Sequence, residues 1–180
     1  MAKPKAIVVG AGGISRAWFP PLKAEKVDVV AVADIREEAA RQRIDEFELS
    51  GTKAYTDMNQ AFRDEAADFV IDLTTPEVHC QVCCAAMKAG LHVVSEKPMA
   101  STMAECRRMV RTSEQTGKMY MVSQSRRWVP VHERLRKTLT RGKIGTLTTA
   151  NCDFYIGIHF RGFRDEMDSP LVLDMSIHHF

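Results

Sequence analysis

The first residues that could do chemistry are three glycines and an aspartate near the N-terminus. Gly10, Gly12 and Gly13 follow a short apolar run, and a helical pattern begins at Ile14. A glycine loop between a strand and a helix lets the backbone approach a pyrophosphate, whose charge meets the amides of the helix N-terminus. Asp34 ends a second apolar run about 20 residues further on, the distance expected of a ribose-binding acid. This order predicts a dinucleotide-binding site.

The type of dinucleotide depends on the residues around Asp34. Its carboxylate would accept hydrogen bonds from the adenosine ribose and repel a 2′-phosphate, which favours NAD as the cofactor. Arg36 follows two residues later and could pair with that phosphate, so NADP stays open. Ser15 occupies the place of the third glycine in the G-x-G-x-x-G pattern. A glycine turn beside a solvated aspartate is the simpler alternative.

A second group of polar residues follows another apolar run. Thr74, Thr75 and Pro76 come directly after it, and His79 lies three residues further on. Ligands of open parallel sheets bind beyond the carboxyl ends of the strands, so this loop is expected to face the cofactor. The same residues suit the start of a helix, because threonine before proline is a common N-terminal signal.

A third group, Glu96 and Lys97, stands at the end of the next apolar run and precedes Pro98. A lysine at the carboxyl end of a buried strand would point into the binding crevice. A lone lysine is more often a loop residue that faces solvent.

Asp174 and His178, near the C-terminus, are four residues apart and so lie on one face of an expected helix. A carboxylate beside an imidazole orients the ring and tunes its pKa around neutral pH, which suits general acid–base catalysis. A helix salt bridge is the alternative. The neighbouring His179 is expected to pack or to face solvent.

Three cysteines, Cys80, Cys83 and Cys84, crowd one predicted helix. No second pair of ligands follows at the spacing of a zinc site, so no metal is expected. We expect these small residues to pack against the sheet. Because the N-terminus does not read as a secretory signal, a cytoplasmic location with reduced thiols is expected.

The charge and hydropathy of the chain argue against an acidic polymer, a nucleic acid or a membrane as partner. The 25 Lys and Arg nearly balance the 23 Asp and Glu, so the formal net charge is only +2 and gives no case for an acidic polymer. The pair Arg126-Arg127 is too short a basic run to indicate nucleic acid. The apolar runs are far shorter than the ~20 residues of a membrane span.

Apolar runs must form the strands that position these groups. Strands that are apolar throughout indicate burial on both faces, as in a parallel sheet. Helical patterns separate the runs, which predicts an α/β fold with a doubly wound parallel sheet of the Rossmann type. Pro20 and Pro21 are expected to kink or interrupt the first helix, which starts near Ile14. The expected strands are residues 6–9, 28–33, 69–73, 92–95 and 119–123, and the further helices are residues 36–48, 77–89 and 103–116.

The pattern changes after residue 123. We expect residues 1–123 to form the nucleotide-binding domain and residues 124–180 to begin an α+β substrate domain with an open sheet. The elements expected there are a helix at 131–141, a long strand at 147–155, an irregular stretch at 157–170 and a helix from Leu171.

Taken in order, these motifs resemble the glucose–fructose oxidoreductase / inositol dehydrogenase family, written Gfo/Idh/MocA. The resemblance covers almost the whole chain, and its most specific part is AGLHVVSEKP at 89–98. The other motifs are GAGGIS at 10–15, Asp34, TTPEVH at 74–79, Arg126-Arg127, GKIG at 142–145 and DMSIH at 174–178.

The resemblance implies an oxidoreductase that transfers a hydride between a nicotinamide cofactor and a secondary hydroxyl of a sugar, polyol or related compound. It implies that Lys97 contacts substrate and nicotinamide, and that His178 is the base, paired with Asp174. Arg127 is implied to contact the substrate. The bond between Lys97 and Pro98 is implied to be cis.

The same resemblance leaves two other functions open. One is an NAD-dependent glycosidase, which regenerates its cofactor in each turnover, and the other is a dinucleotide-binding module without turnover. Family members continue for a comparable stretch beyond the D-x-x-x-H helix, so this chain is expected to be a truncated member that lacks much of the substrate domain. A homo-oligomer formed through the C-terminal sheet is also expected.

Overall fold

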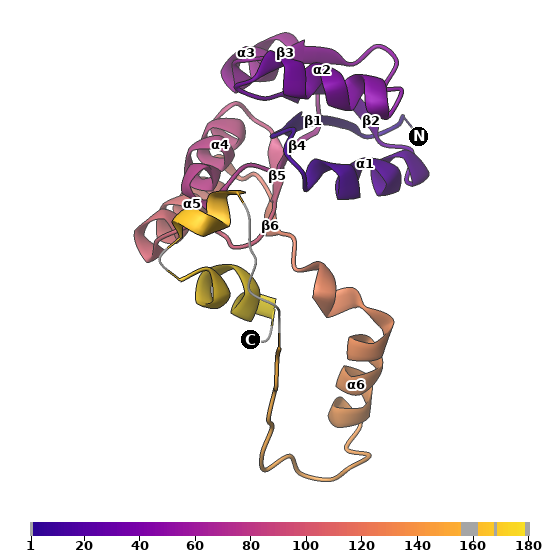
Figure 1. Ribbon diagram of the computed structural model, residues 1–180, viewed down its shortest axis with the longest axis vertical. Helices are drawn as coiled ribbons and strands as arrows, with labels where there is room; N and C mark the ends of the chain where they lie inside the picture. Colours follow the sequence, from indigo (N-terminus) through magenta and orange to yellow (C-terminus); the bar gives the residue numbers. More distant parts are fainter. Residues whose placement is uncertain (1, 156–161, 168, 179–180) are drawn as a thin grey trace. The chain divides into compact units, whose positions relative to one another are not determined.

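The structure, a computed structural model, describes residues 2–155, 162–167 and 169–178. The chain forms two compact units, unit 1 (Met1–Ser123) and unit 2 (Gln124–Phe180) (Figure 1). Two of the expected features, His179 and part of the irregular stretch 157–170, lie outside the described residues.

Unit 1 is the doubly wound parallel sheet that the sequence predicts. Its strands lie in the order β3-β2-β1-β4-β5-β6, and every neighbouring pair is parallel. The chain builds outward from β1 to one edge and then from β4 to the other, so the order reverses between β1 and β4. The strands are β1 Lys5–Val9, β2 Asp28–Ala33, β3 Lys53–Tyr55, β4 Phe69–Asp72, β5 His92–Ser95 and β6 Tyr120–Val122. The helices are α1 Ser15–Ala24, α2 Glu37–Glu46, α3 Met58–Asp64, α4 Pro76–Lys88 and α5 Met103–Thr116.

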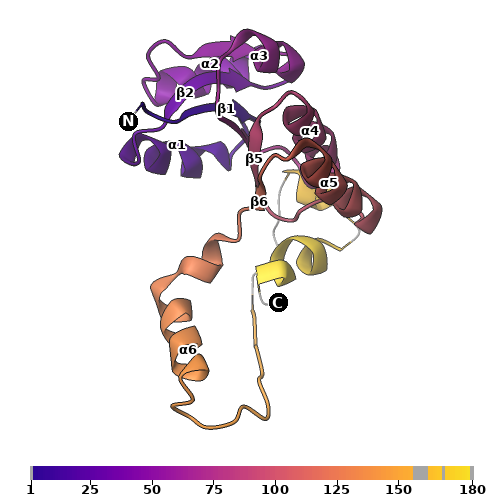
Figure 2. The same cartoon turned by 180° about the vertical axis from the view of Figure 1, so that it is seen from behind.

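Helices cover both faces of this sheet, which explains why its strands are apolar throughout. Ile7 and Val9 belong to a buried cluster with residues of α3, α4 and α5. Ala6 and Val8, which point the other way, belong to a second cluster with residues of α1 and α2. Helices α4 and α5 lie side by side in both views of the ribbon (Figure 1, Figure 2).

Helix α1 runs through Pro20 and Pro21 as one element, so of the two expected effects, a kink or an interruption, the interruption is wrong. The two prolines remove amide donors, but both are exposed, and so are Arg16 and Ala17, the residues four positions earlier whose carbonyl groups lose those donors. Phe19 and Leu22 are buried on the other side of the helix. Packing of this apolar side outweighs the two lost hydrogen bonds.

Two elements of unit 1 were not predicted, β3 and α3. Strand β3 has three residues, of which only Tyr55 is buried, so it gives almost no apolar signal. Helix α3 has seven residues and begins at a side-chain cap, where Asp57 accepts a hydrogen bond from the amide of Asn59 at 2.9 Å. Short elements of this kind carry too few apolar residues to show a period.

Unit 2 contains helix α6 (Pro130–Thr140) and several short helical turns. The expected strand at 147–155 is wrong, because residues 147–155 form no strand and Tyr155 is 91% exposed. A strand exists only through pairing with a neighbour, and the described part of unit 2 contains no other strand. The expected C-terminal helix is a π-helix, Leu171–Met175, followed by a 3-10 turn, Ser176–His178.

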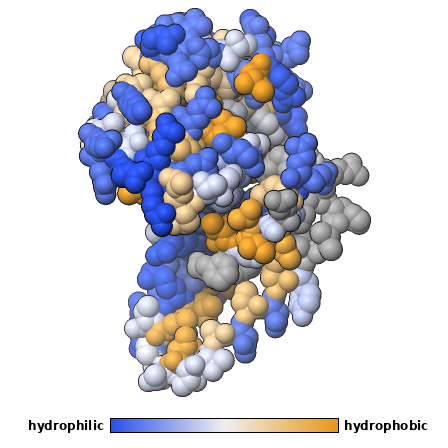
Figure 3. Space-filling view, turned by 90° about the vertical axis from the view of Figure 1, so that its left-hand side faces the viewer, coloured by the Kyte–Doolittle hydropathy of each residue, from blue (hydrophilic) through white to orange (hydrophobic). Residues whose placement is uncertain are grey.

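Within the described ranges, no helix combines the length and apolarity that a membrane crossing requires. The space-filling view shows hydrophobic residues at the surface among hydrophilic ones (Figure 3). In unit 2 the exposed large apolar side chains include Trp128, Val131, Leu135 and Val172.

Candidate functional site

The glycine loop between β1 and α1 is held against the end of β4. Gly10 has a φ of +97°, and a Cβ at this position would lie 2.7 Å from the carbonyl carbon of Leu73. The amide of Gly10 donates to the carbonyl oxygen of Ala33 at 2.8 Å. A Cβ at Gly12 or Gly13 would meet nothing within 4 Å, so the backbone there is open to a ligand.

Asp34 follows β2 and is fixed against this loop by both carboxylate oxygens. Its Oδ2 accepts from the amide of Ala11 at 2.8 Å, and its Oδ1 accepts from the amide of Arg36 at 2.9 Å. The Nε of Arg36 lies 3.7 Å from the same Oδ1. The structure therefore brings the glycine loop, Asp34 and Arg36 together, and Ile14 lies half-exposed at the end of the loop.

A pocket of about 560 Å³ opens beside the loop and is rich in arginine. Arg36 was expected near it, whereas Arg16 and Arg43 were not. Its lining residues are Ala11, Gly12, Gly13, Arg16, Arg36, Glu38, Ala39, Gln42 and Arg43.

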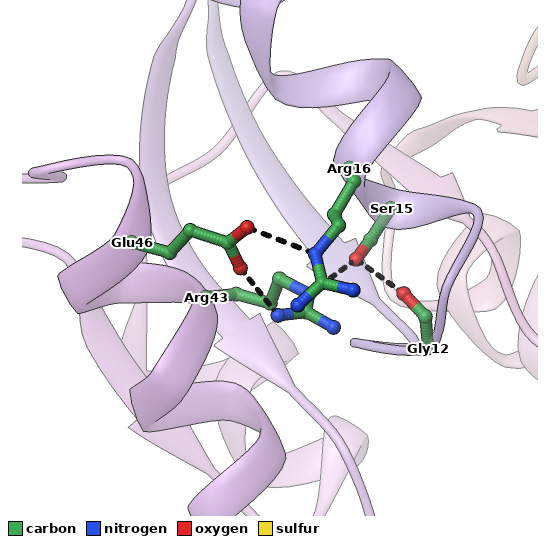
Figure 4. A network of polar contacts seen from close by, with 5 residues as sticks. All are labelled: Gly12, Ser15, Arg16, Arg43 and Glu46. Atoms are coloured by element: carbon green, nitrogen blue, oxygen red, sulfur yellow. Dashed lines mark hydrogen bonds and ion pairs between the residues drawn. The ribbon is translucent and has the colours of Figure 1, made fainter.

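Ser15, which takes the place of the third glycine, connects the loop to α2 (Figure 4). It is fully buried, and its hydroxyl donates to the carbonyl oxygen of Gly12 at 2.6 Å. The Nε of Arg43 donates to the same hydroxyl at 3.0 Å. Arg43 is buried on α2 together with Ala40, which its charge alone does not suggest, because arginines are mostly exposed.

The loop after β4 is organised by Asp72 and His79. The Oδ1 of Asp72 accepts from the amide of Thr74 at 3.0 Å and from its hydroxyl at 2.6 Å. The Nε2 of His79 lies 3.0 Å from the carbonyl oxygen of Thr74, and its Nδ1 lies 2.9 Å from that of Pro98. His79 thus connects the loop after β4 with the loop after β5. Thr75 is the residue before α4, so these residues also open the helix.

The three clustered cysteines are buried in the core, where the packing interpretation places them. Burial raises the pKa of the Cys80 thiol to about 11. Burial, followed by the nearby carboxyl of Asp72, raises the pKa of Cys83 still further. The Sγ of Cys83 donates to Oδ2 of Asp72 at 3.2 Å, and burial raises the pKa of Asp72 as well.

The loop after β5 carries Glu96 and the half-buried Lys97, and the bond between Lys97 and Pro98 is cis. The Oε2 of Glu96 accepts from the amide of Lys97 at 3.1 Å. Its Oε1 accepts from the indole Nε1 of Trp18 at 2.9 Å. Trp18, on α1, was not expected at this site, and its contact connects the helix after the glycine loop with the lysine loop.

Unit 2 contains the remaining candidates. Arg127 is exposed in the 3-10 turn Ser125–Trp128. Asp174 is buried and accepts a hydrogen bond from Nε of Arg164 at 2.7 Å. The segment that carries Asp174 and His178 is not the regular α-helix expected, because the winding changes from π to 3-10 between them. The π-helix has more residues per turn than an α-helix and the 3-10 helix has fewer. A spacing of four residues therefore does not by itself imply that two side chains lie on one face.

These features define a nucleotide-binding protein of the Rossmann type, with a glycine loop, an acid after β2 and further polar loops at the carboxyl edge of the sheet. The family model GFO_IDH_MocA, described as an oxidoreductase family with an NAD-binding Rossmann fold, matches residues 5–124. The chain belongs to this family.

Individual relatives extend the match. A 1,5-anhydro-D-fructose reductase of Ensifer adhaerens is 28% identical over 177 residues, which cover 95% of this chain and 53% of that protein. An inositol 2-dehydrogenase of Salmonella typhimurium is 32% identical over 144 residues, which cover 78% and 43%. The chain spans about half the length of the curated relatives it matches.

A solved structure agrees with the sequence relatives. The myo-inositol dehydrogenase from Lactobacillus casei, in complex with NAD(H) and myo-inositol, superposes with a TM-score of 0.75 at 28% identity. The match covers 80% of this chain and 43% of that one.

Proposed function

We propose that this chain is the NAD-binding half of a dehydrogenase that oxidises a secondary hydroxyl of a sugar, a polyol or a related compound, or reduces the corresponding ketone. The observation that carries the proposal is the glycine loop, closed against β4 at Gly10, open at Gly12 and Gly13, and fixed to Asp34. Relatives named as an inositol dehydrogenase and an anhydrofructose reductase support this substrate class.

The residues of the loop fit a dinucleotide. Open backbone at Gly12 and Gly13 precedes the N-terminus of α1, where amides would meet the pyrophosphate. Asp34 is held by two backbone amides, so its remaining lone pairs are positioned for the ribose hydroxyls. Ile14, Arg36, Thr74, Thr75, Pro76, His79, Glu96 and Lys97 complete the proposed cofactor-binding set.

The nicotinamide ring, when bound, supplies the hydride acceptor. In the proposed reaction Lys97 stabilises the negative charge that develops on the substrate oxygen, and His178 takes the hydroxyl proton. Asp174 orients His178, and Arg127 binds the substrate. These roles follow from the family motifs.

The proposal also includes the location of the protein and its self-association. We propose a cytoplasmic location, because the clustered cysteines Cys80, Cys83 and Cys84 are buried as reduced thiols in the core. We also propose self-association through unit 2, whose exposed apolar side chains include Trp128 and Val172.

A second candidate function is a dinucleotide-binding module without turnover. The positions of the two hydrophobic clusters favour this function. Both clusters consist of residues of unit 1, the unit that contains the proposed dinucleotide site.

Titration of the 180-residue chain with NADH and NADPH, followed by nicotinamide fluorescence, tests cofactor binding. Saturable binding that is tighter for NADH is expected. Assays with NAD and a panel of polyols then test turnover, where net NADH formation separates a dehydrogenase from a glycosidase. Absence of net NADH formation, together with intact binding, would favour the module.

The variant Lys97→Ala tests the proposed chemistry. It should lower turnover by about 100-fold or more while the dissociation constant for NADH stays within about twofold. Lys88→Ala, at an exposed position near the end of α4, is the matched control and should retain activity. Near-normal turnover of Lys97→Ala would contradict the assignment.

A further inference from the structure

Arg16, Arg36 and Arg43 line the pocket beside the glycine loop, and each of them pairs with a carboxylate. Arg36 faces Asp34, as described above. Arg16 and Arg43 share a single partner, Glu46, which stands at the end of α2. The cations of the pocket are therefore matched by acids of the same chain.

Glu46 uses one carboxylate oxygen for each of its two arginines (Figure 4). Its Oε1 accepts from Nε of Arg16 at 2.8 Å, and its Oε2 accepts from Nη1 of Arg43. The two arginines come from different helices, α1 and α2. One carboxylate thus controls the direction of two guanidinium groups at the edge of the pocket.

The charge of Glu46 is secure at neutral pH. The hydrogen bond from Arg16 lowers its pKa, and the charges of Arg16 and Arg43 add to this effect against an opposing contribution from burial. Arg16 is half-exposed, so its side chain has room to turn once that partner is removed. Arg43 is almost fully buried and is held further by Ser15.

NAD and NADP differ by a phosphate on the adenosine ribose, next to the acid that follows β2. Guanidinium groups bind phosphate strongly when they are available, so a pocket with three arginines would favour the phosphorylated cofactor. We propose that Glu46 determines the cofactor preference of this chain, by keeping Arg16 and Arg43 in ion pairs and away from a 2′-phosphate. This inference rests on the proposed cofactor pocket and adds a determinant outside the loop that contains Asp34.

The test is the variant Glu46→Gln, which keeps the shape of the side chain and removes its charge. The dissociation constants of NADH and NADPH are measured by nicotinamide fluorescence on the full chain, with circular dichroism as the check of folding. The NADPH-to-NADH ratio of dissociation constants should fall by about tenfold, because a cation is released toward the phosphate. Raising the ionic strength should reduce this gain.

Two further variants keep the inference falsifiable. Glu37→Gln removes the same charge from the same helix, but Glu37 pairs with Arg41, which does not line the pocket. The NADPH-to-NADH ratio of dissociation constants of Glu37→Gln should equal that of the wild type. Adding Arg16→Gln to Glu46→Gln should reverse most of the gain for NADPH, since Arg16 is the exposed partner.

The outcomes separate this inference from the proposed function. Equal weakening of both cofactors by Glu46→Gln, or an equal shift of the ratio in Glu37→Gln, would overturn the role of Glu46 but not the proposed binding of NAD by the wild-type chain. A wild-type chain that binds neither NADH nor NADPH would overturn the proposed function and this inference with it.

Discussion

Unit 1 and unit 2 bury different kinds of residue. Unit 1 has a hydrophobic cluster on each face of its sheet. Among the described residues of unit 2 the only buried one is Asp174, a charged residue in an ion pair with Arg164. Apolar burial is the main stabilising contribution in folding, so the nucleotide-binding half carries its own stability. Unit 2 depends on helix hydrogen bonds and ion pairs, which contribute less.

The largest expected effect is that of Gly10→Ala on unit 1. The added Cβ would overlap the backbone at Leu73, and the positive φ adds strain, so we expect the free energy of unfolding to fall by about 2–4 kcal/mol. NADH binding should be lost with it. Gly51→Ala is the control, because Gly51 also has a positive φ but a Cβ there meets nothing within 4 Å. Equal urea midpoints for the two variants would mean that contact with β4 is unimportant.

A second effect within unit 1 depends on pH and on Asp72. Burial raises the pKa of this carboxyl in the folded state, so the unfolded chain loses the proton first. Stability should therefore fall as the pH rises from about 4 to the folded-state pKa, by at most about 1.4 kcal/mol per pH unit. Asp72→Asn, which keeps an acceptor for Thr74, should flatten this slope in urea unfolding between pH 4.5 and 8. Equal slopes in both proteins would contradict the assignment.

Asp174→Asn probes unit 2 and should have a smaller, local effect. The substitution weakens the hydrogen bond from Arg164, so segment 171–178 should lose about 1–2 kcal/mol of local stability. Hydrogen–deuterium exchange in that segment is the measurement, and exchange in β1 and β4 should be unchanged. Faster exchange in those central strands would show that the units unfold together, which would break the comparison.

The smallest effect is expected from Glu133 on α6. A hydrogen bond from Arg136, with help from Lys137, holds the pKa of Glu133 at about 2. The contribution of these pairs is complete above the ordinary pKa of a glutamate and is lost as the pH falls toward 2. Glu133→Gln should remove this pH dependence from the amide signals of α6 in NMR spectra. The change should be slight and sensitive to salt, because the pairs are exposed.

Several strands and helices of unit 1 were predictable because their signals are local. Asp28–Ala33, His92–Ser95 and Met103–Thr116 have the predicted bounds, since a buried apolar run or a helical period lies within one short segment. The strand expected at 147–155 also has residues typical of strands, namely Leu147, two threonines, Phe154 and Tyr155. It is not a strand because pairing depends on a neighbour, which composition does not report.

The candidate site likewise has features that were predictable from the sequence and features that were not. The glycine loop and Asp34 were found because they form a motif of fixed spacing within one βαβ unit. Contacts between separate elements were not found, such as Trp18 with Glu96 or Arg43 with Ser15. Such contacts depend on how each helix packs against the sheet. A single sequence does not show which residues of two separate elements come into contact.

The strand order of unit 1 also has a consequence for its synthesis on the ribosome. β1, β2 and β3 emerge in the order in which they extend the sheet toward one edge, and β4, β5 and β6 then extend it toward the other. Each new strand joins a free edge, and none has to insert between two strands that are already paired. The sheet can therefore grow while the chain is being made, because its last strand, β6, ends at Val122 and is translated before any of unit 2.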